Sequence, residues 1–186
     1  MKFLKRFILI ILILVLVLIG VGYLLPGEAQ VERDIRIDAP PEAVFSHVND
    51  LRRFNEWSPW AGRAEDIEYS YGGPDSGVGA RMDWQSSSSE LGDGSVLITE
   101  SRGPGRVVMR LDLGARGRPT VYFDIDPANN GSHVVWGFRE AFDDNIIDRY
   151  IGLIMNYQVG GDFEQGLQSL KANVEADTDV ETGTDE

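Results

Sequence analysis

Two glutamates, Glu100 and Glu140, are the best candidates for acid–base chemistry in this sequence. Each lies in an expected strand, residues 94–102 and 133–142, on the same face as apolar residues at alternate positions. If both faces point inward, the carboxyl groups enter an apolar space, where burial raises a carboxyl pKa toward the range of a general acid or base. Alternatively, a one-residue change of strand parity leaves them hydrated at the rim or paired with arginines. The candidate arginines are Arg102, Arg110 and Arg139.

Other kinds of chemistry have little support in the sequence. The two histidines, His47 and His133, are far apart and there is no cysteine, so we predict no metal site. The glycine-rich stretch 72–79 precedes an expected strand, whereas a phosphate-binding loop precedes a helix. The serines at 86–89 lack the G-x-S-x-G pattern of a nucleophile elbow. We therefore expect no cofactor.

The elements that would position these glutamates follow from hydrophobic periodicity and turn residues. Val31, Ile35 and Ile37 share one face of a first strand, with Arg33 as the exception. The prolines at 40 and 41 favour a helix start, and that helix should run to about Phe54. Short turns then separate a series of expected antiparallel strands. These strands cover residues 67–71, 79–85, 94–102, 106–113, 120–126 and 133–142.

The last expected element is a long amphipathic helix over residues 145–174, with apolar residues at spacings of three and four. Gly160 and Gly161 interrupt it and indicate a kink, a break or a close approach to the helix backbone. The simplest arrangement is α+β: a curved antiparallel sheet of about six to seven strands wrapped on this helix. That arrangement buries the apolar faces of both.

The N-terminal residues 7–25 carry no charge and are long enough to cross the ~30 Å hydrocarbon core as one helix. Lys2, Lys5 and Arg6 precede this run, which predicts a cytoplasmic N-terminus and a periplasmic or extracellular domain at the inner (plasma) membrane. The alternative is a signal sequence cleaved after Ala29.

Composition sets further limits on function. The net charge of −13 and the lack of a basic stripe make nucleic acid an unfavourable partner. We divide the chain into an anchor and linker (residues 1–30), one domain (residues 31–174) and an acidic, disordered tail (residues 175–186).

The order of elements and four short stretches resemble the helix-grip superfamily, which includes the lipid-transfer START domains. Within that superfamily (SRPBCC, START-like), the chain is most similar to the polyketide cyclase/dehydrase and lipid transport group, and its anchor resembles that of membrane-tethered bacterial members. The four stretches are residues 31–37 running into 39–45, residues 57–60 (WSPW), residues 77–84 (GVGARMDW) and residues 161–171 (GDFEQGLQSLK). The resemblance implies a hollow interior that accepts an apolar small molecule, but it implies no reaction.

Taken alone, the aromatic residues would simply form a core, whereas the resemblance implies that several of them line a cavity. The candidate cavity residues are Trp57, Trp60, Trp84, Glu100, Met109, Phe123, Trp136, Phe138, Tyr150, Ile154 and Tyr157. We expect the domain to bind a hydrophobic small molecule or lipid at the outer face of a membrane. One alternative is a cyclase or dehydratase that uses Glu100 or Glu140. The other is a non-catalytic interaction module with a filled interior and an exposed apolar patch.

Overall fold

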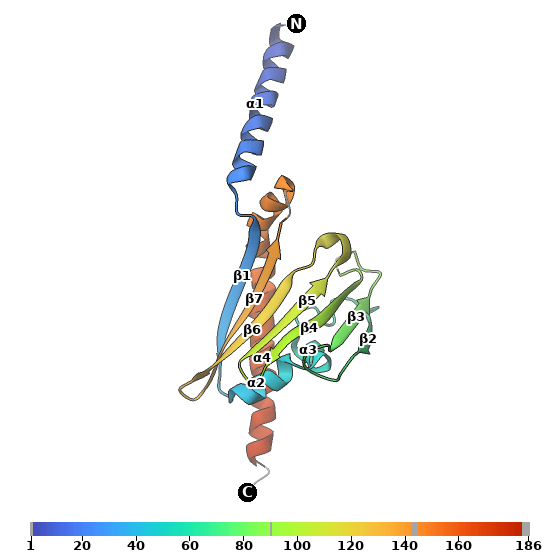
Figure 1. Cartoon of the computed structure of the whole chain (residues 1–186), viewed down its shortest axis with the longest axis vertical. Helices are drawn as coiled ribbons and strands as arrows, with labels where there is room; N and C mark the ends of the chain where they lie inside the picture. Colours follow the sequence, from blue (N-terminus) through green and yellow to red (C-terminus); the bar gives the residue numbers. More distant parts are fainter. Residues whose placement is uncertain (1, 90, 143–144, 184–186) are drawn as a thin grey trace.

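The computed structural model describes the backbone of residues 2–89, 91–142 and 145–183, and within these ranges the side chains of residues 2, 154–158 and 181–183 are not described (Figure 1). The first helix, α1 (Lys2–Leu24), projects from one end of a domain made of a sheet and a long helix. Its segment Phe3–Leu24 is long and apolar enough to cross a membrane.

The domain contains a seven-stranded antiparallel sheet with the strand order β1-β7-β6-β5-β4-β3-β2. Its strands are β1 (Glu28–Ile37), β2 (Glu68–Gly72), β3 (Arg81–Gln85), β4 (Gly94–Arg102), β5 (Arg106–Asp112), β6 (Thr120–Ala128) and β7 (Gly131–Ala141). The long helix α4 (Ile146–Gly183) packs most closely against β1. A short helix, η1 (Gly114–Arg116), joins β5 to β6. This α+β arrangement confirms the helix-grip prediction.

The expected helix after the first strand is divided into α2 (Pro41–Val48) and α3 (Leu51–Trp57). Asp50 separates them in an extended conformation and caps α3, because its carboxylate accepts a hydrogen bond from the Arg52 N–H at 2.8 Å. The division turns α3 so that Leu51 and Trp57 are both buried.

Helix α4 continues through Gly160 and Gly161 without a break. A Cβ atom added at Gly160 would lie 2.8 Å from Cζ of Arg33, so this glycine makes room for the guanidinium group. Arg33 comes from the inner face of β1 and forms an ion pair with Glu164 at 2.7 Å. The glycine therefore serves the close approach that we expected at this position.

Helix α4 also extends to Gly183, so the prediction of a disordered tail from residue 175 is wrong for residues 175–183. Glu175 accepts hydrogen bonds from the Asp38 N–H and from Lys171. Burial opposes ionisation of Glu175, but these hydrogen bonds outweigh it and hold its pKa below the ordinary value. Acidic residues that bind the domain in this way favour a continued helix over a solvated chain.

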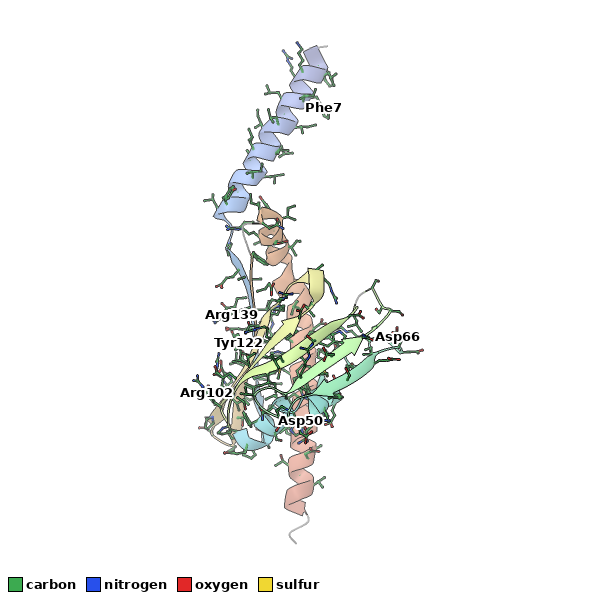
Figure 2. The ribbon with its side chains drawn as sticks, turned by 45° about the vertical axis from the view of Figure 1, so that its right-hand side comes forward. Phe7, Asp50, Asp66, Arg102, Tyr122 and Arg139 are labelled. Carbon is green, nitrogen blue, oxygen red and sulfur yellow. The ribbon has the colours of Figure 1, made fainter. Side chains whose placement is uncertain are left out.

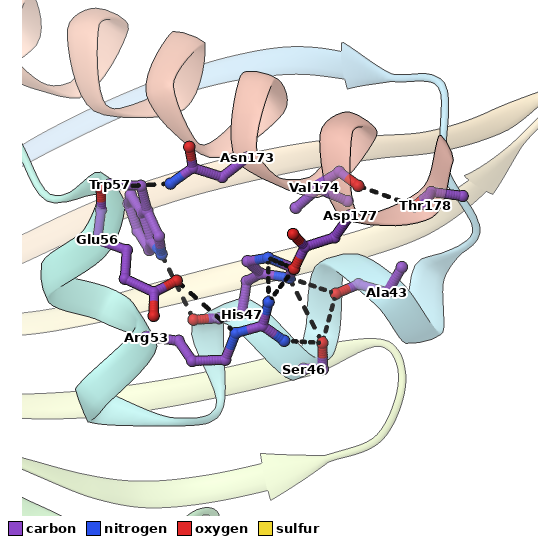
Figure 3. A network of polar contacts seen from close by, with 10 residues as sticks. All are labelled: Ala43, Ser46, His47, Arg53, Glu56, Trp57, Asn173, Val174, Asp177 and Thr178. Carbon is purple, nitrogen blue, oxygen red and sulfur yellow. Dashed lines mark hydrogen bonds and ion pairs between the residues drawn. The ribbon is translucent and has the colours of Figure 1, made fainter. Parts of the chain in front are cut away.

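A buried histidine joins this end of α4 to the two short helices (Figure 3). The Nδ1 atom of His47 lies 2.9 Å from the carbonyl oxygen of Ala43, and its Nε2 atom lies 2.6 Å from the Arg53 guanidinium group. Nδ1 therefore carries the proton, and Nε2 accepts from Arg53. Arg53 also binds the carboxylate of Asp177. The structure thus assigns His47 to a packing role in the interior, where its side chain is buried.

Candidate ligand-binding cavity

A cavity of about 270 Å³ lies between the sheet, helix α4 and the segment that contains α3. This volume is close to the lower end of the range for small-molecule sites, roughly 300–1,000 Å³. The walls are mostly apolar and aromatic. The lining residues are Phe54, Asn55, Ser58, Trp60, Ala61, Ile67, Tyr69, Met82, Trp84, Leu91, Val96, Met109, Leu111, Leu113, Arg116, Pro119, Val121, Trp136, Phe138, Glu140, Val159, Asp162 and Phe163.

Trp136 of β7 is the centre of the aromatic wall. Its ring stacks on Phe163 of α4 at a centroid distance of 4.1 Å and on Phe123 at 5.2 Å. Trp57 and Trp60 meet it edge-on at 5.4 and 5.7 Å. Trp136 and Phe123 are completely buried, so this wall is a rigid part of the core as well as a cavity surface.

The loop after α3 is held over the cavity by a carboxylate on α4. Asp162 accepts a hydrogen bond from the indole N–H of Trp60 at 3.2 Å and from the guanidinium group of Arg63 at 3.2 Å. The Asp162 side chain is only 25% exposed, which strengthens these charged hydrogen bonds. Trp60 is therefore fixed as a wall residue.

Two further polar contacts connect the loops at the opposite side of the cavity. The guanidinium group of Arg116 donates a hydrogen bond to the carbonyl oxygen of Leu91, and both residues line the cavity. Asp66, labelled in Figure 2, accepts hydrogen bonds from Ser86 and from the N–H and hydroxyl of Ser87, and these hold its pKa below the ordinary value. Asp66 thereby joins the segment before β2 to the loop after β3.

The structure separates the two candidate glutamates. Glu140 lines the cavity, and its Oε1 accepts a hydrogen bond from the Arg118 N–H at 3.0 Å. Glu100, in contrast, lies on the outer face of the sheet, because a β-bulge between Ile98 and Glu100 reverses the parity of β4. Glu100 pairs there with Arg102 at 3.2 Å and with Arg106 at 3.4 Å. The prediction that Glu100 enters the cavity is therefore wrong, and the ion-pair alternative holds for it.

The other candidate residues fall into four groups. The residues Trp60, Trp84, Met109, Trp136 and Phe138 line the cavity. Trp57 and Phe123 lie in the core behind the lining, and Trp57 donates its indole N–H to the carbonyl oxygen of His47 at 3.4 Å. Tyr150 lies away from the cavity, against α1. Ile154 and Tyr157 lie outside the described side chains.

Sequence reasoning missed the lining residues that come from loops and short helices, among them Phe54, Leu91, Leu113 and Pro119. Leu91, Leu113 and Pro119 lie outside helices and strands, where no periodicity marks an inward position, so no signal pointed to them. Phe54 could have been found, because it follows Leu51 at helical spacing. Tyr69 could have been found, because it alternates with Ile67 in an expected strand. Burial at this wall raises the pKa of Tyr69, and the neighbouring Tyr71 adds to the shift.

No group of three or more possible metal ligands occurs among the residues that the structure describes. His133 lies on the surface, where its Nε2 is 3.0 Å from a carboxylate oxygen of Asp34. The two histidines are held by separate partners.

Solved structures share this fold at low sequence identity. A Staphylococcus aureus protein of unknown function has a TM-score of 0.63 and 12% identity, over 82% of this chain and 96% of its own. An uncharacterized protein from Rhizobium leguminosarum has a TM-score of 0.59 and 15% identity, over 80% and 95% of the two chains. DynU16, a protein of the dynemicin biosynthetic locus, has a TM-score of 0.55 and 14% identity, over 79% of this chain and 47% of its own.

No curated protein sequence matches the chain significantly. The sequence model of one family does match, over residues 28–175, which includes the whole sheet and most of α4. That range also contains every described residue of the cavity wall. The chain therefore belongs to the polyketide cyclase / dehydrase and lipid transport family.

Proposed function

We propose that the domain binds a hydrophobic small molecule or lipid in the cavity between the sheet and α4, while α1 tethers it to the outer face of a membrane. The observation that carries this proposal is the cavity itself, with its mostly apolar and aromatic walls. Burying about 300 Å² of ligand surface would contribute roughly 7 kcal/mol before ordering costs are subtracted. Such a gain supports useful affinity for an apolar molecule.

The indole N–H of Trp136 suggests one chemical feature of the ligand. This N–H is buried and has no hydrogen-bond partner among the residues that the structure describes. An unpaired buried donor costs about 1–3 kcal/mol. A ligand with an acceptor oxygen, such as a ketone, ester or carboxyl group, would remove that cost. We therefore favour an amphiphile or oxygenated apolar molecule over a pure hydrocarbon.

The test is binding of the fluorescent fatty acid cis-parinaric acid to the full chain in detergent. Leu111→Trp adds volume to the cavity wall and should weaken binding about ten-fold, or about 1.4 kcal/mol. Val108→Trp is the matched control, because Val108 lies on the same strand, β5, but outside the cavity lining. Equal binding by both variants would place the probe outside the cavity and overturn the proposal, as would no binding by the unmodified chain.

The indole N–H resonances of the four tryptophans offer a second readout. Trp57 and Trp60 donate to protein oxygens, whereas Trp136 has no such partner within the described residues. An oxygenated ligand should therefore shift the Trp136 N–H resonance most strongly downfield. A shift at Trp57 or Trp60 alone would contradict the assignment of the acceptor to Trp136.

An enzymatic function is the second candidate, and Glu140 is the observation that favours it. Its carboxylate lies at the cavity wall, where it could exchange a proton with a bound molecule. Substituting Glu140→Gln keeps the shape and the hydrogen bond from the Arg118 N–H. If the protein is an enzyme that uses Glu140, the substitution would abolish turnover of a substrate and leave the binding of that substrate unchanged. Turnover that survives the substitution would exclude Glu140.

The orientation of the tether can be tested independently of the ligand. Segment Phe3–Leu24 has a mean hydropathy of 3.3, and the basic residues Lys5 and Arg6 lie in its first turn. Alkaline phosphatase fused after Gly183 should be active, because it folds only outside the cytoplasm. An inactive fusion would reverse the proposed topology.

A further inference from the structure

The start of α4 exposes three large apolar side chains. Ile147, Ile151 and Leu153 are 67%, 51% and 57% exposed. Ile147 and Ile151 are four residues apart and lie on one face of the helix, and we call these two residues the α4 apolar patch. Leu153 lies on another side of the same helical turns. The other large apolar residues that are exposed in the described part of the domain are scattered, and they are Tyr69, Tyr71, Val78 and Val180.

Specific contacts join this part of α4 to the end of α1, which enters the domain beside it in Figure 1. The hydroxyl of Tyr150 donates a hydrogen bond to the carbonyl oxygen of Leu18 at 2.6 Å. The side chain of Ile146 occupies the place that a side chain at Gly22 would need. The guanidinium group of Arg149 donates to the carbonyl oxygen of Leu25 at 3.2 Å.

These contacts give the depth of the patch along α1. Leu18 lies six residues before the end of α1 at Leu24, which is about 9 Å at 1.5 Å per residue. The first turns of α4 thus run beside the last 9 Å or so of a helix that is about as long as a bilayer core is thick. An interfacial helix buries its apolar face about 5–10 Å into the boundary between headgroups and acyl chains, which is the same depth.

We propose that Ile146–Leu153 is a second membrane contact, with the α4 apolar patch inserted in the outer headgroup–acyl boundary of the bilayer that α1 crosses. This inference rests on the proposed tether. The occupant of the patch is a phospholipid surface, because Tyr150 and Arg149 hold this part of α4 beside α1, whose apolar side chains are exposed. The net charge of −13 makes this an apolar rather than an electrostatic contact, so it requires no anionic lipid.

Two attachment points would fix how the domain faces the membrane. Glu28, which begins the first strand after α1, pairs with Ala141 at the end of β7. The cavity residues Leu113, Pro119 and Glu140 lie at this same end of the sheet, since Thr120 pairs with Arg139. This end of the cavity would therefore face the bilayer. A lipid would then have a short path from the bilayer into the cavity.

The absence of cysteine from the chain allows a clean test with single-cysteine variants. Ile151→Cys probes the patch, Leu14→Cys probes the middle of α1, and Val180→Cys is a control on the far end of α4, where the native side chain is 70% exposed. Each full-length variant is labelled with the fluorophore NBD and reconstituted into phosphatidylcholine vesicles. Quenching is measured with lipids that carry a nitroxide either near the headgroup or deep in the acyl chain.

We expect the shallow nitroxide to quench the label at residue 151 most strongly. The deep nitroxide should quench the label at residue 14 most strongly. Neither nitroxide should quench the label at residue 180. Quenching at 14 but not at 151 would overturn the second contact and leave the tether intact. Quenching at neither position would overturn both proposals. Quenching at 180 would mean that the domain lies flat on the bilayer, which also contradicts the proposed orientation.

Discussion

The indole ring of Trp84 on β3 lies directly against the backbone of Gly94, its partner on β4. A Cβ atom added at Gly94 would lie 2.7 Å from Cε2 and 2.8 Å from Cη2 of the indole, closer than real Cβ contacts allow. Gly94 therefore lets Trp84 lie flat on the sheet and form a wall of the cavity without filling it.

Replacing Gly94→Ala should push the Trp84 ring into the cavity. We expect weaker cis-parinaric acid binding together with a loss of about 1–3 kcal/mol in the free energy of unfolding, as for other overpacked sites. Gly72→Ala is the matched control, because nothing lies within 4 Å of a Cβ atom at that strand position. Binding and urea denaturation curves would check both variants. An unchanged affinity in Gly94→Ala would show that the ligand does not touch Trp84.

Glu100 should have no contact with a bound ligand, because it does not line the cavity. Glu100→Gln removes a charge from the outer face, where Arg102 and Arg106 surround it, so we expect no change in cis-parinaric acid affinity and a stability change near 0.5 kcal/mol. Fluorescence titration measures the first quantity and urea denaturation the second. A marked loss of affinity in Glu100→Gln would mean that β4 lacks the bulge.

Tyr122 lies on the outer face of β6 and yet is only 4% exposed. Its ring covers Gly137 and lies under the guanidinium groups of Arg106 and Arg139, at 5.4 and 5.2 Å. Figure 2 labels Tyr122 and Arg139 beside each other. The Tyr122 hydroxyl donates a hydrogen bond to Glu32. That hydrogen bond is the main cause that lowers the pKa of Glu32. The pKa of Tyr122 is raised, mainly by burial and secondly by the hydrogen bond to Glu32.

The lowered pKa of Glu32 predicts the pH dependence of Tyr122→Phe. A carboxyl with a depressed folded pKa stabilises the protein above its unfolded pKa, and this contribution is lost as the pH falls through the folded value. The variant should thus be less stable than the unmodified chain by about 1 kcal/mol at neutral pH, with the difference shrinking below about pH 4.5. Tyr69→Phe is the control, because no carboxylate contributes to its pKa shift. A difference that stays constant down to pH 2 would contradict this linkage.

The end of α4 should contribute to stability. Ending the chain after Val174 removes Glu175 and Asp177, which bind Asp38, Lys171 and Arg53. We expect a loss of about 1–2 kcal/mol in the free energy of unfolding, since both side chains are partly exposed. Ending the chain after Asp179 keeps these contacts and should cost much less. Equal stability of the two truncated chains would show that residues 175–179 form no stable helix in solution.

The sequence by itself was sufficient for the order of the elements and for most inward-facing residues. Alternation in residues 133–142 correctly placed Trp136, Phe138 and Glu140 toward the interior, because a regular strand keeps its parity along its length. The apolar N-terminal helix needed no tertiary information either, since its length and hydropathy are local properties.

Only the tertiary structure decided which residues form the cavity. The bulge before Glu100 depends on how β4 pairs with β5, which no local pattern reveals. Trp57 and Trp60 have similar surroundings in the sequence, yet only Trp60 reaches the cavity, because Asp162 on the distant helix α4 holds its indole there. The acidic residues after Val174 continue the helix because Asp38 and Arg53, far away in the sequence, supply their partners. Long-range contacts of this kind override local propensity.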